Sequence, residues 1–461
     1  MRRTALAAAF VLALGAATAV AWIQAERDRE YRRLIGAGDA SIAAGQLTQA
    51  IEAFSGALAL KPDSMLAYLR RGETYRRTGD LKAALRDLRE AAALDPGATR
   101  PLEQLGDVQH ALGRYETAAE RYAAYVALDD RSPHVLYKLA LSWYQNGQPA
   151  SAIAPLGQAL LINDRFAEAH YLLGLSLDAN QQPGDALPSY EQAVRMAPGL
   201  VPAREALARG YGLSGRRDER IEQLEALAAL EPTRLDRRLS LARAYAGANR
   251  TDLAVTTLGR AAERFPDSVA IYSTLGEVWL AVAEARPDRV ALSKALQALG
   301  MAVLRGGSTS RDLALYGRAQ LRAGDSAGAL RSFGQATTKL PVEPDTFRLL
   351  AKSEAAHGQI RRARDALVRY TILLAGAQTP PQTARQIGEW SLALRDPGTA
   401  ASWLARAVDA GSPDPALLAD LAEAELGAGR TDAARATVAR ALSLFPASPR
   451  LRSLGARLHA S

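Results

Sequence analysis

The sequence predicts an all-α protein that is built as a solenoid of stacked helical pairs. One amphipathic pattern recurs along the chain, as in "AIEAFSGALALKP" at residues 50–62 and "ARATVARALSLFP" at residues 434–446. The composition is 48% hydrophobic but only 6% aromatic, and its abundant Ala and Leu favour helices. The chain has 461 residues, whereas a single hydrophobic core stops growing at about 250–300 residues. A stacked repeat array is the common way to exceed that limit.

One alanine in each copy sets the period of the pattern. This alanine recurs as Ala50, Ala84, Ala118, Ala152, Ala186 and Ala254. The spacing is 34 residues up to Ala186 and 68 residues from there to Ala254, with Arg220 at the skipped position. Prolines follow the same register at Pro62, Pro96, Pro198, Pro232 and Pro266. Two independent markers with one period indicate a repeat of 34 residues.

Each unit carries the signals of two helices and of the turn between them. When Tyr31 is counted as position 1, apolar residues at positions 4, 7, 8 and 11 form the stripe of a first helix. Those at positions 20, 24 and 27 form the stripe of a second helix. Position 15 is often Gly or Asn, which adopt left-handed backbone most easily. Proline at position 32 ends the second helix because it has no N–H group. The small residue at position 8 lets the two helices approach closely.

This unit resembles the tetratricopeptide repeat. The resemblance implies a right-handed α-solenoid of about twelve units over residues 24–448. The units begin at residues 31, 65, 99, 133, 167, 201, 235, 269, 310, 344, 381 and 415. The eighth is longer by seven residues, because its second-helix alanine is Ala295 rather than residue 288, and Gln378 to Pro380 precede the eleventh. We expect residues 449–461 to form a capping helix over the last apolar face.

Several residues depart from the pattern and mark weaker units. Arg220 replaces the second-helix alanine of the sixth unit. The third and fourth units end in Asp130 and Asp164 instead of proline. Pro155 and Pro188 lie inside second helices, where a proline beyond the first turn is expected to kink the helix.

Residues 1–23 are predicted to be a signal peptide or a transmembrane anchor. They combine a basic start, "MRR", with an apolar run over residues 5–23, close to the ~20 residues that span a bilayer. Ala19 and Ala21 form an A-x-A cleavage pattern. Cleavage after Ala21 gives a periplasmic or secreted protein, whereas retention anchors the chain in the inner membrane. Both alternatives place the repeats outside the cytoplasm; a cytosolic protein with a buried N-terminal helix is the less favoured interpretation.

Composition excludes several classes of function. The chain contains no cysteine, so disulfides, thiolate nucleophiles and Cys-type zinc sites are excluded. The formal net charge is +8, but the 57 basic residues are interleaved with 49 acidic ones, and no nucleic-acid-binding module is recognisable. We therefore expect no nucleic-acid partner. The sequence makes no prediction of oligomeric state.

The chain is not expected to be an enzyme. The repeats occupy residues 31–448, so no segment of domain size remains for a catalytic domain. "GYGLSG" at residues 210–215 spells a dinucleotide-binding pattern but ends a first helix, where such a site needs a preceding strand. The five histidines, His110, His134, His170, His357 and His459, show no metal-binding spacing. We expect no catalytic residue, no cofactor and no metal.

The resemblance also implies where partners bind, because first helices line the concave face through unit positions 2, 5, 9, 12 and 13. In units 4 and 5 these positions supply an aromatic patch: His134, Tyr137, Tyr144 and Tyr171. In units 9 to 11 they supply a basic strip: Arg311, Arg318, Arg322, Arg348, Lys352 and Arg385. The strip resembles the carboxylate-binding groove of chaperone-binding members, although its asparagines are missing. A solvated face and ordinary packing are the competing interpretations of the strip and the patch.

The sequence thus predicts a non-enzymatic scaffold of the bacterial cell envelope. Its groove would bind peptide or helical segments of other proteins, and residues 5–23 would contact the inner membrane if they are retained. The alternative is an accessory subunit of polysaccharide synthesis or export, or of other glycan-handling machinery.

Overall fold

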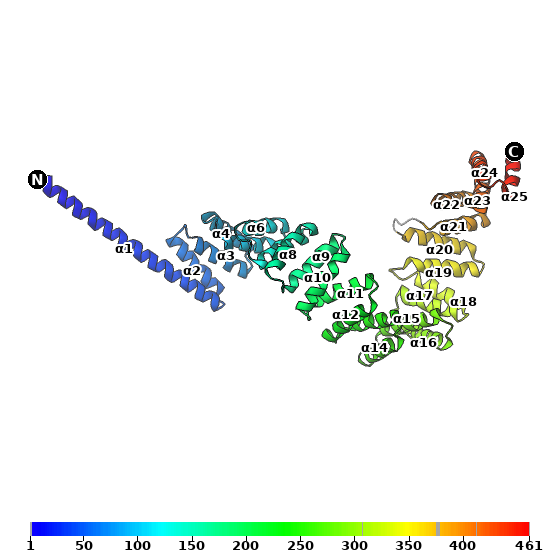
Figure 1. The fold of residues 1–461 in the computed structure, drawn as a ribbon, viewed down its shortest axis with the longest axis horizontal. Coiled ribbons are helices and arrows are strands. Elements are labelled where there is room, and N and C mark those ends of the chain that lie inside the picture. Colours follow the sequence, from blue (N-terminus) through cyan, green and yellow to red (C-terminus); the bar gives the residue numbers. More distant parts are fainter. Residues whose placement is uncertain (1, 307, 375–378, 412, 461) are drawn as a thin grey trace. The chain divides into compact units, whose positions relative to one another are not determined.

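The computed structural model describes residues 2–306, 308–374, 379–411 and 413–460. These residues form 25 helices and, within those ranges, no strand (Figure 1). Consecutive helices pack as antiparallel pairs, and within residues 1–230 and within residues 231–461 each pair packs on the next. The predicted all-α solenoid of helical repeats is therefore confirmed.

The chain divides into two compact units, Met1–Leu230 and Glu231–Ser461. The helices of the first unit are α1 (Arg2–Ala43), α2 (Leu47–Leu60), α3 (Met65–Thr78), α4 (Leu81–Leu94), α5 (Thr99–Ala111), α6 (Tyr115–Leu128), α7 (Pro133–Gln145), α8 (Pro149–Ile162), α9 (Ala167–Ala179), α10 (Pro183–Met196), α11 (Val201–Leu213) and α12 (Arg217–Leu230). Those of the second are α13 (Leu235–Gly247), α14 (Thr251–Arg264), α15 (Val269–Ala285), α16 (Arg289–Leu304), α17 (Ser310–Arg322), α18 (Ser326–Ala336), α19 (Pro344–Ala356), α20 (Ile360–Leu373), α21 (Pro381–Ala393), α22 (Pro397–Ala410), α23 (Pro415–Gly427), α24 (Thr431–Leu444) and α25 (Pro449–Ala460).

Helix α1 joins the N-terminal segment to the first repeat without a break. Its pairing with α2 includes a hydrogen bond from Arg27 to the Leu60 carbonyl and an ion pair between Asp28 and Lys61 at 2.8 Å. Upstream, Trp22 is 68% exposed. The side chains of residues 1–13, 15 and 16, most of the predicted signal or anchor, lie outside the described residues. Within the described part of the chain, none of the helices has both the length and the apolar content to cross a bilayer.

The turn inside each repeat is left-handed at position 15. A positive φ at this position occurs in eleven of the pairs, at Gly45, Gly79, Gly113, Gly147, Gln181, Gly215, Asn249, Gly324, Gly358, Arg395 and Gly429. Glycine reaches this region without steric cost, whereas Gln181 and Arg395 reach it with side chains that disfavour it. The predicted role of position 15 is correct, and the tight turn overrides local preference at these two residues.

Within each repeat, the small residue at position 8 lies against the bulky residue at position 24. A methyl group added to Gly106 would lie 2.5 Å from the Tyr122 ring, and one added to Gly317 would lie 2.7 Å from the Phe333 ring. No real Cβ sits this close, so the two helices could not keep their spacing. The backbones approach closely because the glycine leaves room for the ring.

The residue at position 8 limits the size of the residue at position 24. Aromatic residues at position 24 are Phe54, Tyr122, Tyr190 and Phe333, and each faces a glycine. Where position 8 is alanine, position 24 is leucine or valine, as in Ala140 with Leu156 and Ala351 with Leu367. The alanine methyl group takes the space that a ring would need.

The longer eighth repeat keeps this contact. Gly276 of α15 lies against Leu299 of α16, which is 23 residues further along the chain instead of the usual 16. The extra seven residues lengthen α15 to 17 residues and form the connection before α16. Ala295, predicted to take the alanine position of this unit, is fully buried. The insertion therefore changes the turn and preserves the packing.

The departures from the pattern have local explanations. Arg220 is exposed and extends over Gly212, which has no side chain to obstruct it, while neighbouring Ile221 is buried. Helices α8 and α10 continue past Pro155 and Pro188. Helices α6 and α8 end at the same unit position as α2 and α4, although aspartate replaces the proline. Proline at position 32 is therefore not needed to end the helix.

Aspartate and serine residues begin several helices by accepting hydrogen bonds from backbone N–H groups. Asp396 Oδ1 accepts from the Thr399 N–H at the start of α22, and its Oδ2 pairs with Arg364 Nη1 at 3.1 Å. Asp414 caps α23 in the same way through Leu417. At the end of the chain, α25 packs on α23 and α24, where Arg450 pairs with Asp420 at 2.6 Å. The division into a signal or anchor, repeats and a capping helix stays a prediction.

The matched sizes at positions 8 and 24 predict a compensating pair of substitutions. Gly317→Ala should destabilise α17 and α18, because overpacking costs about 1–3 kcal/mol and alanine regains only about 1 kcal/mol in a helix. Adding Phe333→Leu should recover stability, since the double variant has the Ala–Leu pair of the next repeat. Amide hydrogen exchange in both helices would measure the local free energies. Additive effects of the two substitutions would contradict the matched contact.

The cap at α22 predicts a pH-dependent contribution to stability. The hydrogen bond from the Thr399 side chain, helped by Arg364 and opposed by desolvation, lowers the pKa of Asp396 below its usual 3.8. The contribution of the charged carboxylate is then complete above pH 3.8 and is lost as the pH falls through the lower, folded pKa. Asp396→Asn should be less stable than the unmodified chain at pH 7. The difference in unfolding free energy should shrink below pH 3.8, and a constant difference would contradict the prediction.

Candidate partner-binding site

First helices of several neighbouring repeats contact one another in each unit. These contacts join α3 to α5 and α7 to α9 in the first unit, and α13, α15, α17 and α19 in the second. Every predicted site residue lies on a first helix. We call this surface the first-helix face.

The structure brings His134 and Tyr137 of the aromatic patch together around a residue that sequence reasoning missed. Phe166, just before α9, lies with its ring centroid 5.0 Å from that of His134 and 5.1 Å from that of Tyr137. The edge-on and tilted geometries are those that aromatic rings prefer. Phe166 occupies the last position of its repeat, outside the positions expected to face the groove. His134 is exposed, and Tyr137 and Phe166 are half-buried.

Tyr144 and Tyr171 continue the patch toward α10. Both are half-buried, and the Tyr171 ring lies 6.1 Å from the ring of buried Tyr190. Burial, together with the negative charge of Glu168, raises the pKa of Tyr137. Burial also raises the pKa of Tyr171. Their hydroxyl groups therefore stay protonated and can donate hydrogen bonds to a partner.

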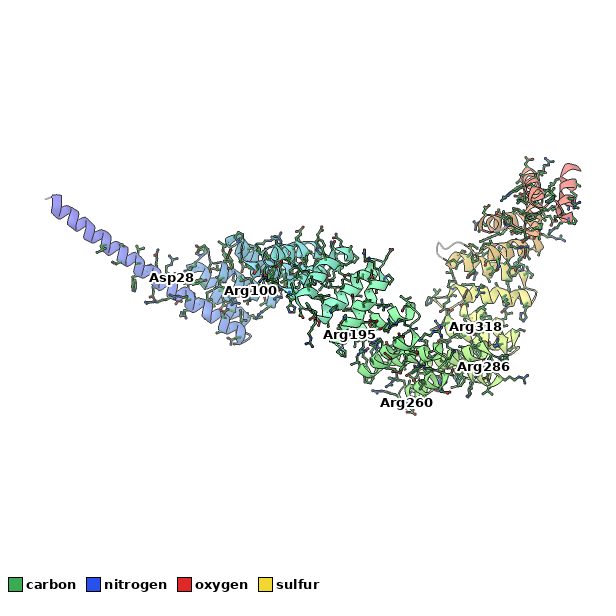
Figure 2. All side chains as sticks on the ribbon, viewed as in Figure 1. Asp28, Arg100, Arg195, Arg260, Arg286 and Arg318 are labelled. Carbon is green, nitrogen blue, oxygen red and sulfur yellow. The ribbon has the colours of Figure 1, made fainter. Side chains whose placement is uncertain are left out.

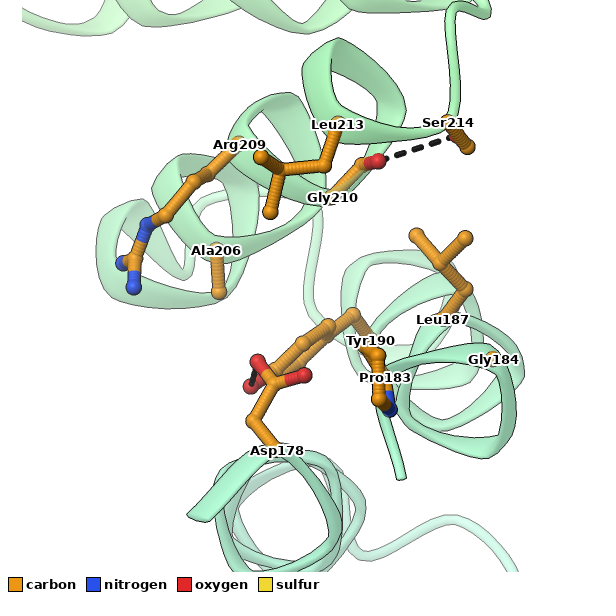
Figure 3. A pocket seen from close by; sticks show the side chains of 10 residues that line it. All are labelled: Asp178, Pro183, Gly184, Leu187, Tyr190, Ala206, Arg209, Gly210, Leu213 and Ser214. Carbon is orange, nitrogen blue, oxygen red and sulfur yellow. Dashed lines mark hydrogen bonds between the residues drawn. The ribbon is translucent and has the colours of Figure 1, made fainter. Parts of the chain in front are cut away.

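A crevice opens beside this patch, between the fifth and sixth repeats (Figure 3). It has a volume of about 260 Å³, and its lining includes Asp178 of α9, Leu187 and Tyr190 of α10, and Ala206, Arg209 and Leu213 of α11. The Tyr190 hydroxyl donates to Asp178 Oδ2 at 2.6 Å. Burial, then this hydrogen bond, raises the pKa of Tyr190. The crevice is thus apolar with two charged side chains at its edge.

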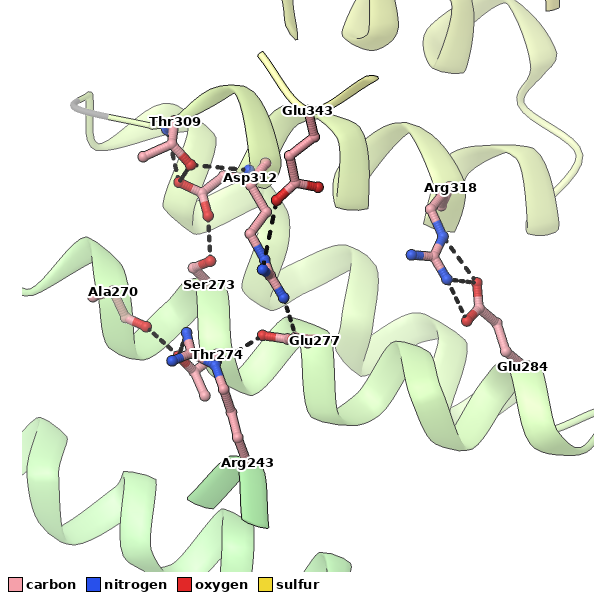
Figure 4. Close-up of polar contacts among 11 residues, drawn as sticks. Arg243, Ala270, Ser273, Thr274, Glu277, Glu284, Thr309, Asp312, Arg318 and Glu343 are labelled. Carbon is pink, nitrogen blue, oxygen red and sulfur yellow. Dashed lines mark hydrogen bonds and ion pairs between the residues drawn. The ribbon is translucent and has the colours of Figure 1, made fainter. Parts of the chain in front are cut away.

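Most of the basic strip is paired with carboxylates. Arg318 donates from Nη2 to both carboxylate oxygens of Glu284, at 2.6 and 2.8 Å (Figure 4). Glu277 accepts from Arg311 Nη2 at 2.7 Å and from Arg243 Nε at 3.1 Å. Each of these pairs joins neighbouring first helices, at a spacing of 34 residues.

The remaining cations of the strip fall into two groups. Arg348 pairs with Asp345 at 3.0 Å, and Arg385 pairs with Glu389 and Asp414. Arg322 and Lys352 are exposed, and neither has a hydrogen bond or ion pair within the described ranges. A hollow of about 350 Å³ gathers Arg311, Arg318 and Arg348, but Glu343 and Asp345 also line it. The strip is therefore nearly neutral, and its unpaired charge lies at two residues.

A similar ladder of charges crosses the first-helix face of the first unit. Glu73 accepts from Arg100, labelled in Figure 2, at 2.6 Å and pairs with Arg70. Lys138 donates to Glu103 at 2.7 Å and to Asp107 at 2.8 Å. Although desolvation lowers the pKa of Lys138, these hydrogen bonds produce a net increase. Opposite charges about one repeat apart are the sequence signal that could have revealed both ladders.

The described side chains offer no site for a metal. No group of three or more His, Asp or Glu side chains among them is arranged to hold an ion. "GYGLSG" forms the end of α11, and a methyl group on Gly210 would lie 2.6 Å from Leu187. Packing thus accounts for the first glycine of that motif.

Sequence profiles of the tetratricopeptide repeat match this chain at residues 35–99, 104–170, 167–199, 238–268 and 391–458. Together these matches cover more than half of the sequence. The chain belongs to the tetratricopeptide repeat (TPR) family. TPR proteins are generally non-enzymatic interaction modules, which agrees with the prediction that the chain binds proteins. No curated protein matches the sequence.

Solved structures of TPR proteins align with parts of the chain. MamA is 27% identical and covers 36% of this chain and 92% of its own length, with a TM-score of 0.35. YrrB, described as a TPR protein with an unusual peptide-binding site, is 20% identical to this chain. The alignment covers 40% of this chain and 95% of YrrB, with a TM-score of 0.37. PilF of Pseudomonas aeruginosa is 22% identical to this chain. The alignment covers 47% of this chain and 99% of PilF, with a TM-score of 0.40.

The pairing in the basic strip predicts different effects for two neighbouring arginines. Arg318→Ala should lower the local stability of α15 and α17 by about 0.2–1 kcal/mol, because it removes a partly exposed ion pair. Arg322→Ala should leave stability unchanged, since its side chain has no partner within the described ranges. Hydrogen exchange of the two helices would report both effects. Equal effects of the two substitutions would show that the Arg318–Glu284 pair contributes nothing.

Proposed function

We propose that this TPR protein is a non-enzymatic scaffold that binds peptide or helical segments of other proteins on its first-helix face. The observation that carries the proposal is the cluster of His134, Tyr137 and Phe166. These rings are only partly covered by the protein itself. Aromatic side chains supply large contact areas at low entropic cost, and they dominate the energetics of many interfaces.

The charge distribution supports the aromatic patch over the basic strip as the main contact. Arg318 and Arg311 already share their hydrogen bonds with Glu284 and Glu277. A partner would have to displace these carboxylates before it could use the guanidinium groups, so the strip has little attraction left for an acidic ligand. Arg322 and Lys352 are the exceptions and would attract partners mainly at long range.

We place this scaffold in the bacterial cell envelope, outside the cytoplasm. The support is the basic start followed by the apolar run over residues 5–23. Cleavage after Ala21 would release the repeats into the periplasm or the medium, and retention would hold them at the inner membrane.

The second candidate function is an accessory role in polysaccharide synthesis or export. Exposed His134 and half-buried Tyr137 favour it, because aromatic faces also stack on sugar rings. The two candidates predict different ligands for one patch, so a single labelling experiment can separate them.

The scaffold proposal predicts site-specific crosslinking in cells. A photoreactive benzoylphenylalanine at His134 should yield protein adducts in the envelope fraction, identified by mass spectrometry. The matched control is the same group at Leu161, which is 89% exposed on the second helix α8. Adducts from Leu161 alone, or none, would contradict the first-helix face as the binding surface. Adducts that glycosidases remove but proteases do not would favour the glycan-handling role.

A further inference from the structure

The crevice between the fifth and sixth repeats is open where neighbouring residues could have closed it. Gly184 of α10 lies on its wall, and a methyl group there would meet nothing within 4 Å. Leu213 of α11 is 82% exposed on the same wall. Tyr190 forms its buried floor. A crevice with an apolar floor and an exposed leucine at its rim is suited to bind an apolar group.

The size of the crevice limits what can enter. Its volume of about 260 Å³ is below the roughly 300–1,000 Å³ of pockets that enclose drug-sized ligands. One large side chain, such as leucine, methionine or phenylalanine, is therefore a better occupant than a small molecule. Such a side chain would reach the crevice as part of an extended or helical protein segment.

Arg209 determines which charge is favoured in the partner segment, at the residue next to the apolar side chain. Its guanidinium lines the crevice, and it has no hydrogen bond or ion pair with any described residue. This distinguishes it from Arg318 and Arg311, whose charges are matched. A guanidinium binds a carboxylate through two parallel hydrogen bonds, so an acidic side chain is the complementary group.

Asp178 orients the segment. Its carboxylate accepts the Tyr190 hydroxyl on the α9 side of the crevice, whereas Arg209 projects from α11 (Figure 3). A carboxylate in the partner would be repelled on the Asp178 side and attracted on the Arg209 side. A free chain terminus is a poorer match, because terminal carboxylates are captured by several donors at once and the crevice offers one guanidinium.

We infer that this crevice is a specificity pocket for protein segments in which a large apolar side chain is followed or preceded by an acidic residue. The apolar side chain lies against Leu187, Tyr190 and Leu213, and the acidic one pairs with Arg209. This inference rests on the proposed scaffold function and names the partner chemistry for that same face.

The test selects ligands without assuming their sequence. A phage-displayed library of random 12-residue peptides is enriched on the full chain, and the most enriched peptide is made with a fluorescein label. The selected sequences should share an apolar–acidic pair. Gly184→Leu fills the crevice and Arg209→Glu reverses its charge, so each should weaken peptide binding about tenfold or more in fluorescence polarisation. Arg209→Lys keeps the positive charge but cannot form the two parallel hydrogen bonds of a guanidinium, so it should lose less affinity for the peptide than Arg209→Glu.

Matched controls separate the crevice from general damage. Gly398→Leu makes the same change after the corresponding proline of α22, where a methyl group also meets nothing within 4 Å. Arg195→Glu makes the same charge change in the last turn of α10, outside the crevice lining. Both controls should bind the peptide as the unmodified chain does. Leucine also favours a helix more than glycine does, so Gly184→Leu is expected to fold.

The outcomes distinguish this inference from the scaffold proposal. If peptides are enriched but Gly184→Leu and Arg209→Glu bind them unchanged, the crevice is not the pocket and the scaffold proposal stands. The same holds if the selected peptides lack an apolar–acidic pair. If no peptide is enriched above an unrelated helical protein, peptide binding by the first-helix face fails as well.

Discussion

The contact between position 8 of the first helix and position 24 of the second is the interaction on which the rest of the structure depends. This contact sets how closely the two helices of a repeat approach each other. That spacing determines which side chains are available to pack against the next repeat. Glycine opposite Tyr122 or Phe333 leaves room for a buried aromatic ring. Alanine opposite Leu156 fills part of the space that such a ring would need. The chain keeps the contact even in the eighth repeat, where seven extra residues move the partner of Gly276 to Leu299. Interior packing tolerates length changes in the turn better than volume changes at this contact.

A regular stack brings equivalent positions of neighbouring repeats together, and the chain uses this to neutralise charge. Glu277 with Arg311 and Glu284 with Arg318 are each 34 residues apart. Such exposed pairs contribute little stability individually. Their larger effect is on recognition, because they remove most of the attraction that the arginines of the second unit would have for acidic partners. Arg209, at the crevice of the first unit, has no such carboxylate partner within the described ranges.

The crevice lies where the repeat departs from its own pattern. In the sixth repeat Arg220 replaces the second-helix alanine and extends over Gly212, and Gly210 allows Leu187 to approach α11. In the same repeat Leu213 is exposed, and Arg209 has no partner within the described ranges. A unit that departs from the pattern in sequence thus contributes residues to the crevice, as expected if regular repeats provide the frame and irregular ones the specificity.

The all-α class, the 34-residue period, the left-handed turn and the close approach at position 8 could be predicted from the sequence, because these features depend on contacts within one repeat. It also placed His134, Tyr137, Tyr144 and Tyr171 on first helices. The contacts of those residues could not be predicted in this way, because they depend on how the helices pack. Phe166 joins the patch from the end of the same repeat as His134 and Tyr137. The carboxylates that pair with Arg311 and Arg318 come from a neighbouring helix. Helical periodicity describes one element at a time, whereas a binding surface is the product of how successive elements stack.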